Sequence, residues 1–164
     1  VELENATVLR ARVIVPLSGS AAAQENAALA SVQFQGARIE PGESLSFNQT
    51  VGLRTEESGY TAAEEPAYGQ NIVGVGGGVC QVSTTLYNAL LQLPEGISIL
   101  YRHAHGPSGA TYAPHGVDAA VGRSNVTGGT IKLNLEFQNV FSFPIVIDCT
   151  VQNGALCIAI RKGA

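Results

Sequence analysis

The sequence predicts a single α+β domain that is rich in strands and has one central helix. Alternating apolar and polar residues predict strands at 7–15 and 130–137. Apolar residues three and four positions apart predict a helix that follows the glycine-rich run 74–78 and ends before Pro94. With 164 residues, 45% of them apolar, the chain is long enough to bury one core without disulfides or metals. We therefore expect one domain over residues 1–164.

The first half of the chain predicts one further helix and one turn. The alanine-rich stretch 24–32 favours a helix. Pro41-Gly42 favours a turn between two short extended pieces, 37–40 and 45–47. Residues 48–72 show no strong period and predict a long, irregular surface excursion.

The second half predicts strands after the central helix. A short strand is expected at 97–101, and the clean alternation at 130–137 predicts another. The chain then closes with a hairpin over about 145–161, whose turn contains Asn153-Gly154. We regard the polar part of the early excursion, residues 53–72, as a candidate lid.

The closing hairpin carries two cysteines that can be arranged in two ways. A three-residue loop centred on Asn153 places Cys149 opposite Cys157, where a disulfide can form. A two-residue Asn153-Gly154 loop places them on opposite faces, because side chains alternate along a strand. The apolar pattern of the two strands favours the two-residue loop and two separate thiols. The cysteine count therefore leaves the redox compartment open.

Composition and charge argue against several kinds of partner. A net charge of −4 with only two lysines argues against a nucleic-acid surface. No apolar run approaches the roughly 18 residues of a membrane span, so we expect no membrane insertion by this domain itself. The chain opens without a signal peptide and begins at Val1, and we expect it to be a domain excised from a longer protein.

The glycine-rich run ends in Cys80, where the central helix is expected to begin. The first turn of a helix carries unpaired N–H groups and partial positive charge, which stabilise a thiolate. Glycines let the backbone approach a ligand closely, so the N–H groups near Gly77 and Gly78 are candidate donors to an oxyanion. The alternative is that Cys80 is a small buried residue packed under the helix.

Two histidines follow in the segment Arg102-His-Ala-His105. On an extended segment His103 and His105 face the same way, so one imidazole can take the thiol proton while the other orients it or binds substrate. Asp118 is a candidate partner of that base, and an aspartate that caps its own turn is the alternative. Arg102 can pair with a substrate carboxylate or form an ordinary surface ion pair.

Further side chains near Cys80 are weaker candidates. Ser83 and Tyr87 lie three and seven residues after Cys80, so they are candidate substrate contacts on one helix face. The alternative for this stretch is hydroxyl bonding back to the helix backbone. His115 lies in a Pro-Gly turn and is a rival base or a surface residue. Cys-x-x-Cys, His-Glu-x-x-His and phosphate-loop spacings are absent, so we expect no metal and no cofactor.

Seven segments resemble the VanW-like domain family, in the family's order, with a core match over about 26–148. The four longest are Pro41-Gly-Glu-Ser-Leu-Ser-Phe-Asn48, Gly76-Gly-Gly-Val-Cys-Gln-Val-Ser-Thr-Thr-Leu-Tyr-Asn88, Arg102-His-Ala-His105 and Gly116-Val-Asp118-Ala. The other three are Val51-Gly52, Gly59-Tyr60 and Tyr112-Ala-Pro. The family is named for an accessory protein in glycopeptide-resistance clusters. The resemblance implies a bacterial location outside the cytoplasmic membrane, facing the cell wall. It also implies, for some members, L,D-transpeptidase activity.

The resemblance implies cysteine-dependent acyl transfer on peptidoglycan stem peptides, in cross-linking or trimming. In this sequence Cys80 matches the nucleophile, His105 the histidine and Asp118 the aspartate of the family pattern. Gly106 departs from the usual serine, and His115 adds a second imidazole. The alternative is a non-catalytic module that binds the wall or a partner protein, with Cys80 structural. The sequence predicts no oligomeric state.

Overall fold

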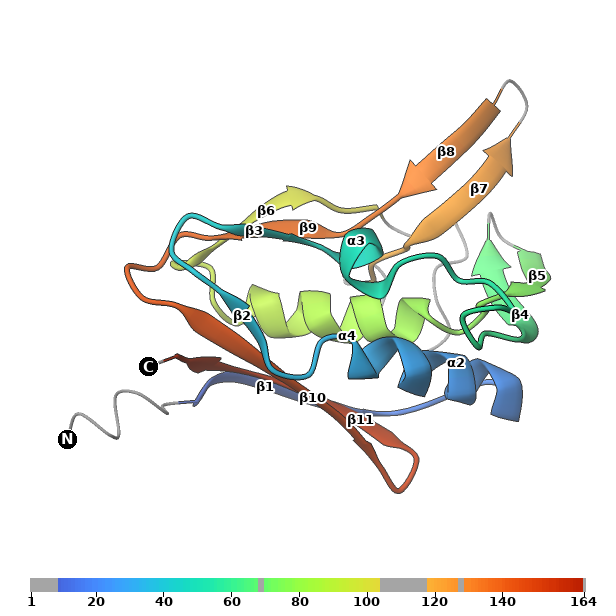
Figure 1. The fold of residues 1–164 in the computed structure, drawn as a ribbon, viewed down its shortest axis with the longest axis horizontal. Helices are drawn as coiled ribbons and strands as arrows, with labels where there is room; N and C mark the ends of the chain where they lie inside the picture. The colour runs from blue at the N-terminus through green and yellow to red at the C-terminus, as the bar shows by residue number, and fades with distance from the viewer. Residues whose placement is uncertain (1–8, 68–69, 104–117, 127–128, 164) are drawn as a thin grey trace.

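The computed structural model describes residues 9–67, 70–103, 118–126 and 129–163 (Figure 1). Every strand pairing in these residues is antiparallel. The largest sheet has the order β1-β11-β10-β2. Its strands are β1 (Leu9–Pro16), β2 (Ala37–Ile39), β10 (Ile145–Gln152) and β11 (Ala155–Lys162).

A three-stranded sheet and two hairpins make up the other strands of the described residues. The sheet has the order β3-β9-β6 and contains β3 (Ser44–Ser46), β6 (Ile97–Tyr101) and β9 (Glu136–Asn139). The hairpins are β4 (Ala62–Ala67) with β5 (Gln70–Val75), and β7 (Gly122–Val126) with β8 (Gly129–Leu133).

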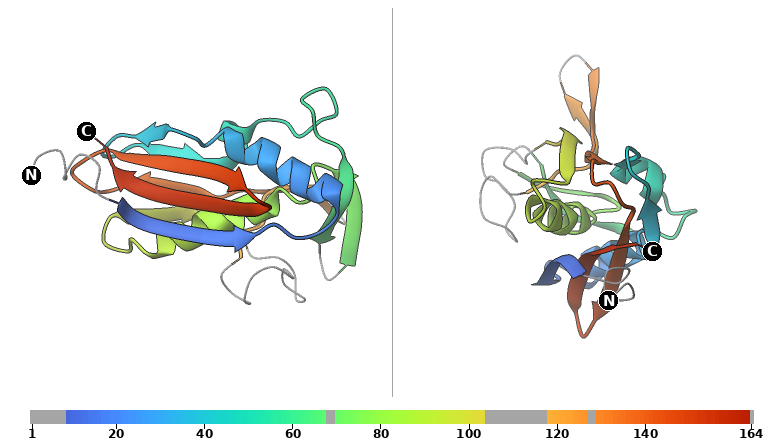
Figure 2. Two further views of the ribbon diagram at one scale, coloured as in Figure 1. Left: turned by 90° about the horizontal axis from the view of Figure 1, so that it is seen from below. Right: turned by 90° about the vertical axis from the view of Figure 1, so that its left-hand side faces the viewer.

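Three helices complete the described fold: α2 (Ala21–Val32), α3 (Phe47–Val51) and α4 (Cys80–Leu91). Helix α4 lies between the four-stranded and three-stranded sheets, with α2 beside it (Figure 1). The two long helices pack on one face of the four-stranded sheet, and no helix of the described residues covers its other face (Figure 2). The predicted α+β class and the central helix that begins at Cys80 are confirmed. None of the helices in the described residues is long and apolar enough to cross a membrane.

One hydrophobic core joins these layers. Leu86 and Leu90 of α4 are fully buried against strand residues such as Phe137, Ile147 and Ile158. Burying an apolar side chain of this size is worth about 1.5–3 kcal/mol. Helix α4 is therefore held firmly along its length, which fixes the position of its first residue, Cys80.

Two sequence expectations are wrong. Residues 48–72 are not an irregular excursion, because they contain most of α3, strand β4 and the start of β5. The Ala-, Glu- and Pro-rich sequence of β4 does not alternate between apolar and polar residues. The sequence therefore gave no sign of a strand there. The single strand expected at 130–137 is two strands in different sheets, β8 and β9. The break lies at Asn134, whose side chain accepts from Asn48 N and donates to Ser46 Oγ.

The closing hairpin has the two-residue loop that the apolar pattern favours. Gln152 pairs with Ala155, and Asn153 and Gly154 both have positive φ, as a tight hairpin turn requires. Cys149 therefore pairs with Ile158 rather than Cys157, and both cysteines are free thiols.

The thiol of Cys149 is expected to make the domain less stable at alkaline pH. Burial raises the pKa of this thiol from 9.0 to about 12. Between these values the unfolded chain loses the thiol proton while the native state keeps it. The contribution to stability is thus fully present below pH 9 and is lost as the pH rises toward 12. Urea unfolding at pH 8 and pH 10.5 should show that the free energy of unfolding falls less between these pH values in Cys149→Ala than in the wild type. An equal loss in both proteins would contradict this.

Candidate active site

The turn before Cys80 is made of glycines because two neighbouring backbones approach it closely. A Cβ on Gly77 would lie 2.2 Å from the Ala63 carbonyl oxygen of β4. A Cβ on Gly78 would lie 2.4 Å from the Ala23 carbonyl oxygen of α2, and Gly78 also has a φ of +99°. The glycines therefore allow the start of α4 to pack closely between α2 and β4.

Asn26 of α2 holds this turn in place. Its Nδ2 donates to Thr61 O at 2.8 Å and to Gly77 O at 2.9 Å, and its Oδ1 accepts from Thr61 N at 3.0 Å. The Asn26 side chain is buried, and its bond to Gly77 O is made away from water. Sequence reasoning missed Asn26. Its one signal was that asparagine is a poor helix former inside an alanine-rich helix.

Asn26→Ala is expected to lower the free energy of unfolding by about 1–3 kcal/mol, because the Gly77 carbonyl loses its buried hydrogen bond and the Thr61 N–H loses the Asn26 acceptor. Glu25→Ala is the matched control, since Glu25 is the preceding, exposed residue of the same helix. It should change stability by no more than about 0.5 kcal/mol. Urea denaturation measures both, and similar effects in the two variants would contradict the role of Asn26.

Cys80 lies in the first turn of α4, in contact with the backbone of Val121. Its Sγ lies 3.5 Å from Val121 N, which donates to it, and 3.6 Å from Val121 O. An N–H donor and the first turn of a helix both stabilise negative charge on sulfur. In the part of the chain that the structure describes, the N–H groups of Gly77 and Gly78 have no hydrogen-bond acceptor. The residue is only 3% exposed.

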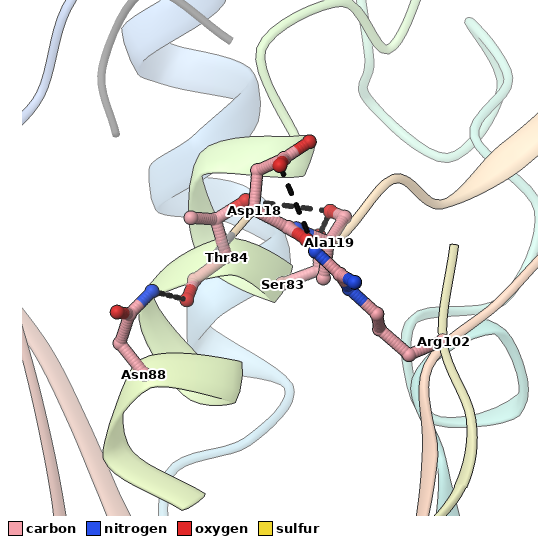
Figure 3. Close-up of polar contacts among 6 residues, drawn as sticks. All are labelled: Ser83, Thr84, Asn88, Arg102, Asp118 and Ala119. Carbon is pink, nitrogen blue, oxygen red and sulfur yellow. Dashed lines mark hydrogen bonds and ion pairs between the residues drawn. The ribbon is translucent and has the colours of Figure 1, made fainter. Parts of the chain in front are cut away.

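The segment 118–121 runs along α4 and is bound to it by hydroxyl groups (Figure 3). Ser83 Oγ donates to Ala119 O at 2.5 Å, and Thr84 Oγ1 accepts from Ala119 N at 2.9 Å. On its other side the segment is tied to the residues after β6, because Ala120 N donates to His103 O at 2.8 Å. The 118–121 segment thus joins the start of α4 to the end of β6.

Arg102 and Asp118 form a pair at one end of this segment (Figure 3). Arg102 Nε and Nη2 donate to Asp118 O at 2.9 and 2.7 Å, and Nη2 lies 3.7 Å from Asp118 Oδ1. The Asp118 residue is 1% exposed, and the guanidinium supplies a balancing charge. Arg102 also lies over the ring of Tyr87, 4.9 Å from its centroid.

His103 lies beside this pair. Its ring meets Tyr101 edge-on, with centroids 4.6 Å apart. Its Nε2 is buried and has no hydrogen-bond partner among the described residues. A buried imidazole nitrogen in this state is available to a substrate or a bound water.

The structure gathers most of the predicted site around the 118–121 segment. The residues brought together are Cys80, Ser83, Tyr87, Arg102, His103 and Asp118. Ser83 and Arg102, expected as substrate contacts, here bind this segment. His105, Gly106 and His115 lie outside the described residues, so the base assigned to His105 stays a prediction. Within the described ranges, no group of three or more His, Cys, Asp or Glu side chains forms a metal-ligand set.

Comparison with known proteins places this arrangement in a family. A family model described as "VanW like protein" matches residues 22–161. The chain belongs to the VanW family. The uncharacterized protein YoaR of Bacillus subtilis (strain 168) is 36% identical to it over 143 residues, which are 87% of this chain. This VanW domain spans 44% of the length of that relative. No solved structure shows significant similarity to the chain.

Proposed function

We propose that this VanW domain catalyses cysteine-dependent acyl transfer on peptidoglycan stem peptides, with Cys80 as the nucleophile. One observation carries the proposal. The Cys80 thiol, in the first turn of α4, accepts from Val121 N of the 118–121 segment. The same segment contains Asp118 and donates from Ala120 N to the carbonyl of His103. Acyl transfer from an amide needs an activated nucleophile, a base and oxyanion donors.

The proposed reaction has two steps. The Cys80 thiolate attacks the carbonyl carbon of an L,D amide bond, and the C–S bond forms as the C–N bond breaks. The thiol proton passes through an imidazole to the departing D-amino acid, and His105 is our candidate for that imidazole. The amine of a second stem or a water molecule then opens the thioester. The N–H groups of Gly77 and Gly78 are the candidate oxyanion donors.

The remaining polar residues of the site have supporting roles in this proposal. Asp118 orients the base, Arg102 holds Asp118 and Ser83 holds the 118–121 segment, while His103 and Tyr87 are candidate contacts to the stem peptide. Because Cys80 is 3% exposed, substrate must displace part of its cover before attack. Such a substrate implies that the domain works outside the cytoplasmic membrane, facing the wall.

The second candidate function is binding without catalysis, in which the domain is a module that binds the wall or a partner protein. The burial of Cys80 favours it, because a buried thiol that contacts backbone groups is also a normal structural residue. The two functions differ in one respect, since the binding module retains its ligand unchanged while the enzyme releases a product.

The test is incubation of the protein with muropeptides that carry tetrapeptide stems, with free D-alanine and dimeric muropeptides measured. Cys80→Ala should lower the release of D-alanine by about 10³-fold or more, the scale of losing a catalytic nucleophile. Cys157→Ala is the matched control, because Cys157 is a partly exposed free thiol on β11. Equal release by the wild type and Cys80→Ala would overturn the proposal.

A further inference from the structure

The glycine turn at residues 76–79 has the pattern of a type II β-turn. Val79 N donates to Gly76 O at 3.3 Å, which closes the turn. Of its two central residues only Gly78 has a positive φ, and a type II turn requires positive φ at that position. The central peptide group joins the Gly77 carbonyl to the Gly78 N–H. In a type I turn this group is turned over, so one peptide flip exchanges the two forms.

Asn26 of α2 binds this central peptide group by its carbonyl. Its Nδ2 donates to Gly77 O at 2.9 Å, and the residue is only 1% exposed. The bonds to the peptide groups of Thr61 fix the orientation of the amide. Because a trans peptide is planar, its C=O and N–H point in opposite directions. The bond from Asn26 therefore directs the Gly78 N–H away from α2 and opposes the flip to the type I form.

The Gly78 N–H is left without an acceptor by this arrangement. Gly78 is buried, and no acceptor for its N–H lies among the described residues. Buried N–H groups in native proteins are nearly always paired, so an exception calls for a bound water or a ligand atom. Gly78 lies two residues before Cys80, which places this N–H at the end of the turn that carries the nucleophile.

We infer that Asn26 is a positioning residue for the oxyanion, an inference that rests on the proposed function. Asn26 keeps the central peptide turned so that the Gly78 N–H binds the oxygen of the carbonyl under attack. As the bond from Cys80 Sγ to the carbonyl carbon forms, the π electron pair moves to this oxygen, and the N–H stabilises the negative charge there. A flipped peptide would instead present Gly77 O, whose partial negative charge opposes the oxyanion.

The test compares two reactions of Cys80 in Asn26→Ala and Asn26→Leu, two variants that remove the amide but differ in the space they leave. One reaction is acyl transfer, measured as D-alanine release from tetrapeptide-stem muropeptides. The other is alkylation by iodoacetamide, in which the sulfur attacks a saturated carbon and displaces iodide. No oxyanion forms in alkylation, so this reaction reports only whether the thiol is ionised and accessible.

Both Asn26 variants should lose acyl transfer selectively. We expect kcat for D-alanine release to fall about 10²-fold, the scale of losing one oxyanion donor, while KM changes by less than about threefold. The alkylation rate of Cys80 should stay within about threefold of the wild type, because Val121 N and the first turn of α4 still stabilise the thiolate.

Gly42→Ala is the control for lost stability. Gly42 lies between β2 and β3 with a φ of +84°, so alanine there strains the backbone of a turn outside the site. Both reactions should stay within about twofold of the wild type in this control. Thermal unfolding verifies that each variant is folded at the assay temperature.

Two results would overturn the role of Asn26. A parallel fall of acyl transfer and alkylation would show that Asn26 only holds Cys80 in place, and undiminished D-alanine release in both variants would show that the turn does not need it. Either result leaves the proposed function standing if Cys80→Ala abolishes release. Equal release by the wild type and Cys80→Ala would instead overturn the proposed function, and the role of Asn26 with it.

Discussion

Gly78→Ala is expected to lower the free energy of unfolding by about 3–5 kcal/mol. Two costs combine at this position. The new Cβ would lie 2.4 Å from the Ala23 carbonyl oxygen, and the backbone would keep a φ of +99°, which disfavours any residue with a side chain. Because Gly78 lies two residues before Cys80, the same change should displace the start of α4.

Two other glycines separate these costs. Gly77→Ala brings only the clash, since its Cβ would lie 2.2 Å from Ala63 O and its φ is not positive. Gly42→Ala brings only the strain of a φ of +84°, because nothing lies within 4 Å of the added Cβ. Urea unfolding should rank Gly78→Ala as the most harmful of the three and Gly42→Ala as the mildest, at about 1–2 kcal/mol. If Gly78→Ala costs no more than Gly42→Ala, close packing is not the reason for glycine.

Thr84→Val is expected to raise the alkylation rate of Cys80 about tenfold or more. Valine has the same shape as threonine but cannot accept from Ala119 N, so the 118–121 segment loses one of its bonds to α4. A buried N–H without a partner costs about 1–3 kcal/mol, and a cost of about 1.4 kcal/mol changes an opening equilibrium tenfold. Iodoacetamide labelling followed by mass spectrometry measures the rate at each cysteine.

The chain supplies its own controls for this experiment. Thr85→Val makes the same change one residue along, where the hydroxyl donates to Gln81 O within the helix and not to the 118–121 segment. Cys149 reports global opening, because it is buried in the core away from this segment. A rise at Cys80 alone, in Thr84→Val alone, is the expected pattern. Equal rises in the two variants, or a parallel rise at Cys149, would contradict local release of the segment.

Local patterns in the sequence predicted the parts of the fold that depend on local chemistry. The apolar stripe and the glycine run located α4 at Cys80, and Asn153-Gly154 located the tight hairpin. The β4–β5 hairpin was not predicted, because its residues pair through the backbone and its sequence does not alternate between apolar and polar residues. The break at Asn134 was not predicted, because it depends on contacts with Ser46 and Asn48, which are far away in the sequence.

The residues that lie around the 118–121 segment were candidates from the sequence, but their contacts with one another were not predicted, and His105 lies outside the described residues. Asp118 was expected beside His105, which lies outside the described residues, whereas the binding of the 118–121 segment to α4 was not predicted. The roles of Thr84 and Asn26 were missed, because each binds residues at least 35 positions away. A periodic pattern among neighbouring residues cannot reveal a contact between residues so far apart in the sequence. Arg102 was considered only for surface or substrate pairing, since its partner Asp118 lies 16 residues further on.

The most direct test of the proposed chemistry is the detection of an acyl group on Cys80. Covalent catalysis passes through a thioester, which an early acid quench traps before a second stem or water opens it. The protein would be mixed with a tetrapeptide-stem muropeptide, quenched in acid, digested and examined by mass spectrometry. The proposed mechanism predicts a mass increase on the Cys80 peptide that matches the shortened stem, and no increase in Cys80→Ala. Release of D-alanine with no acyl group on Cys80, and undiminished in Cys80→Ala, would contradict it.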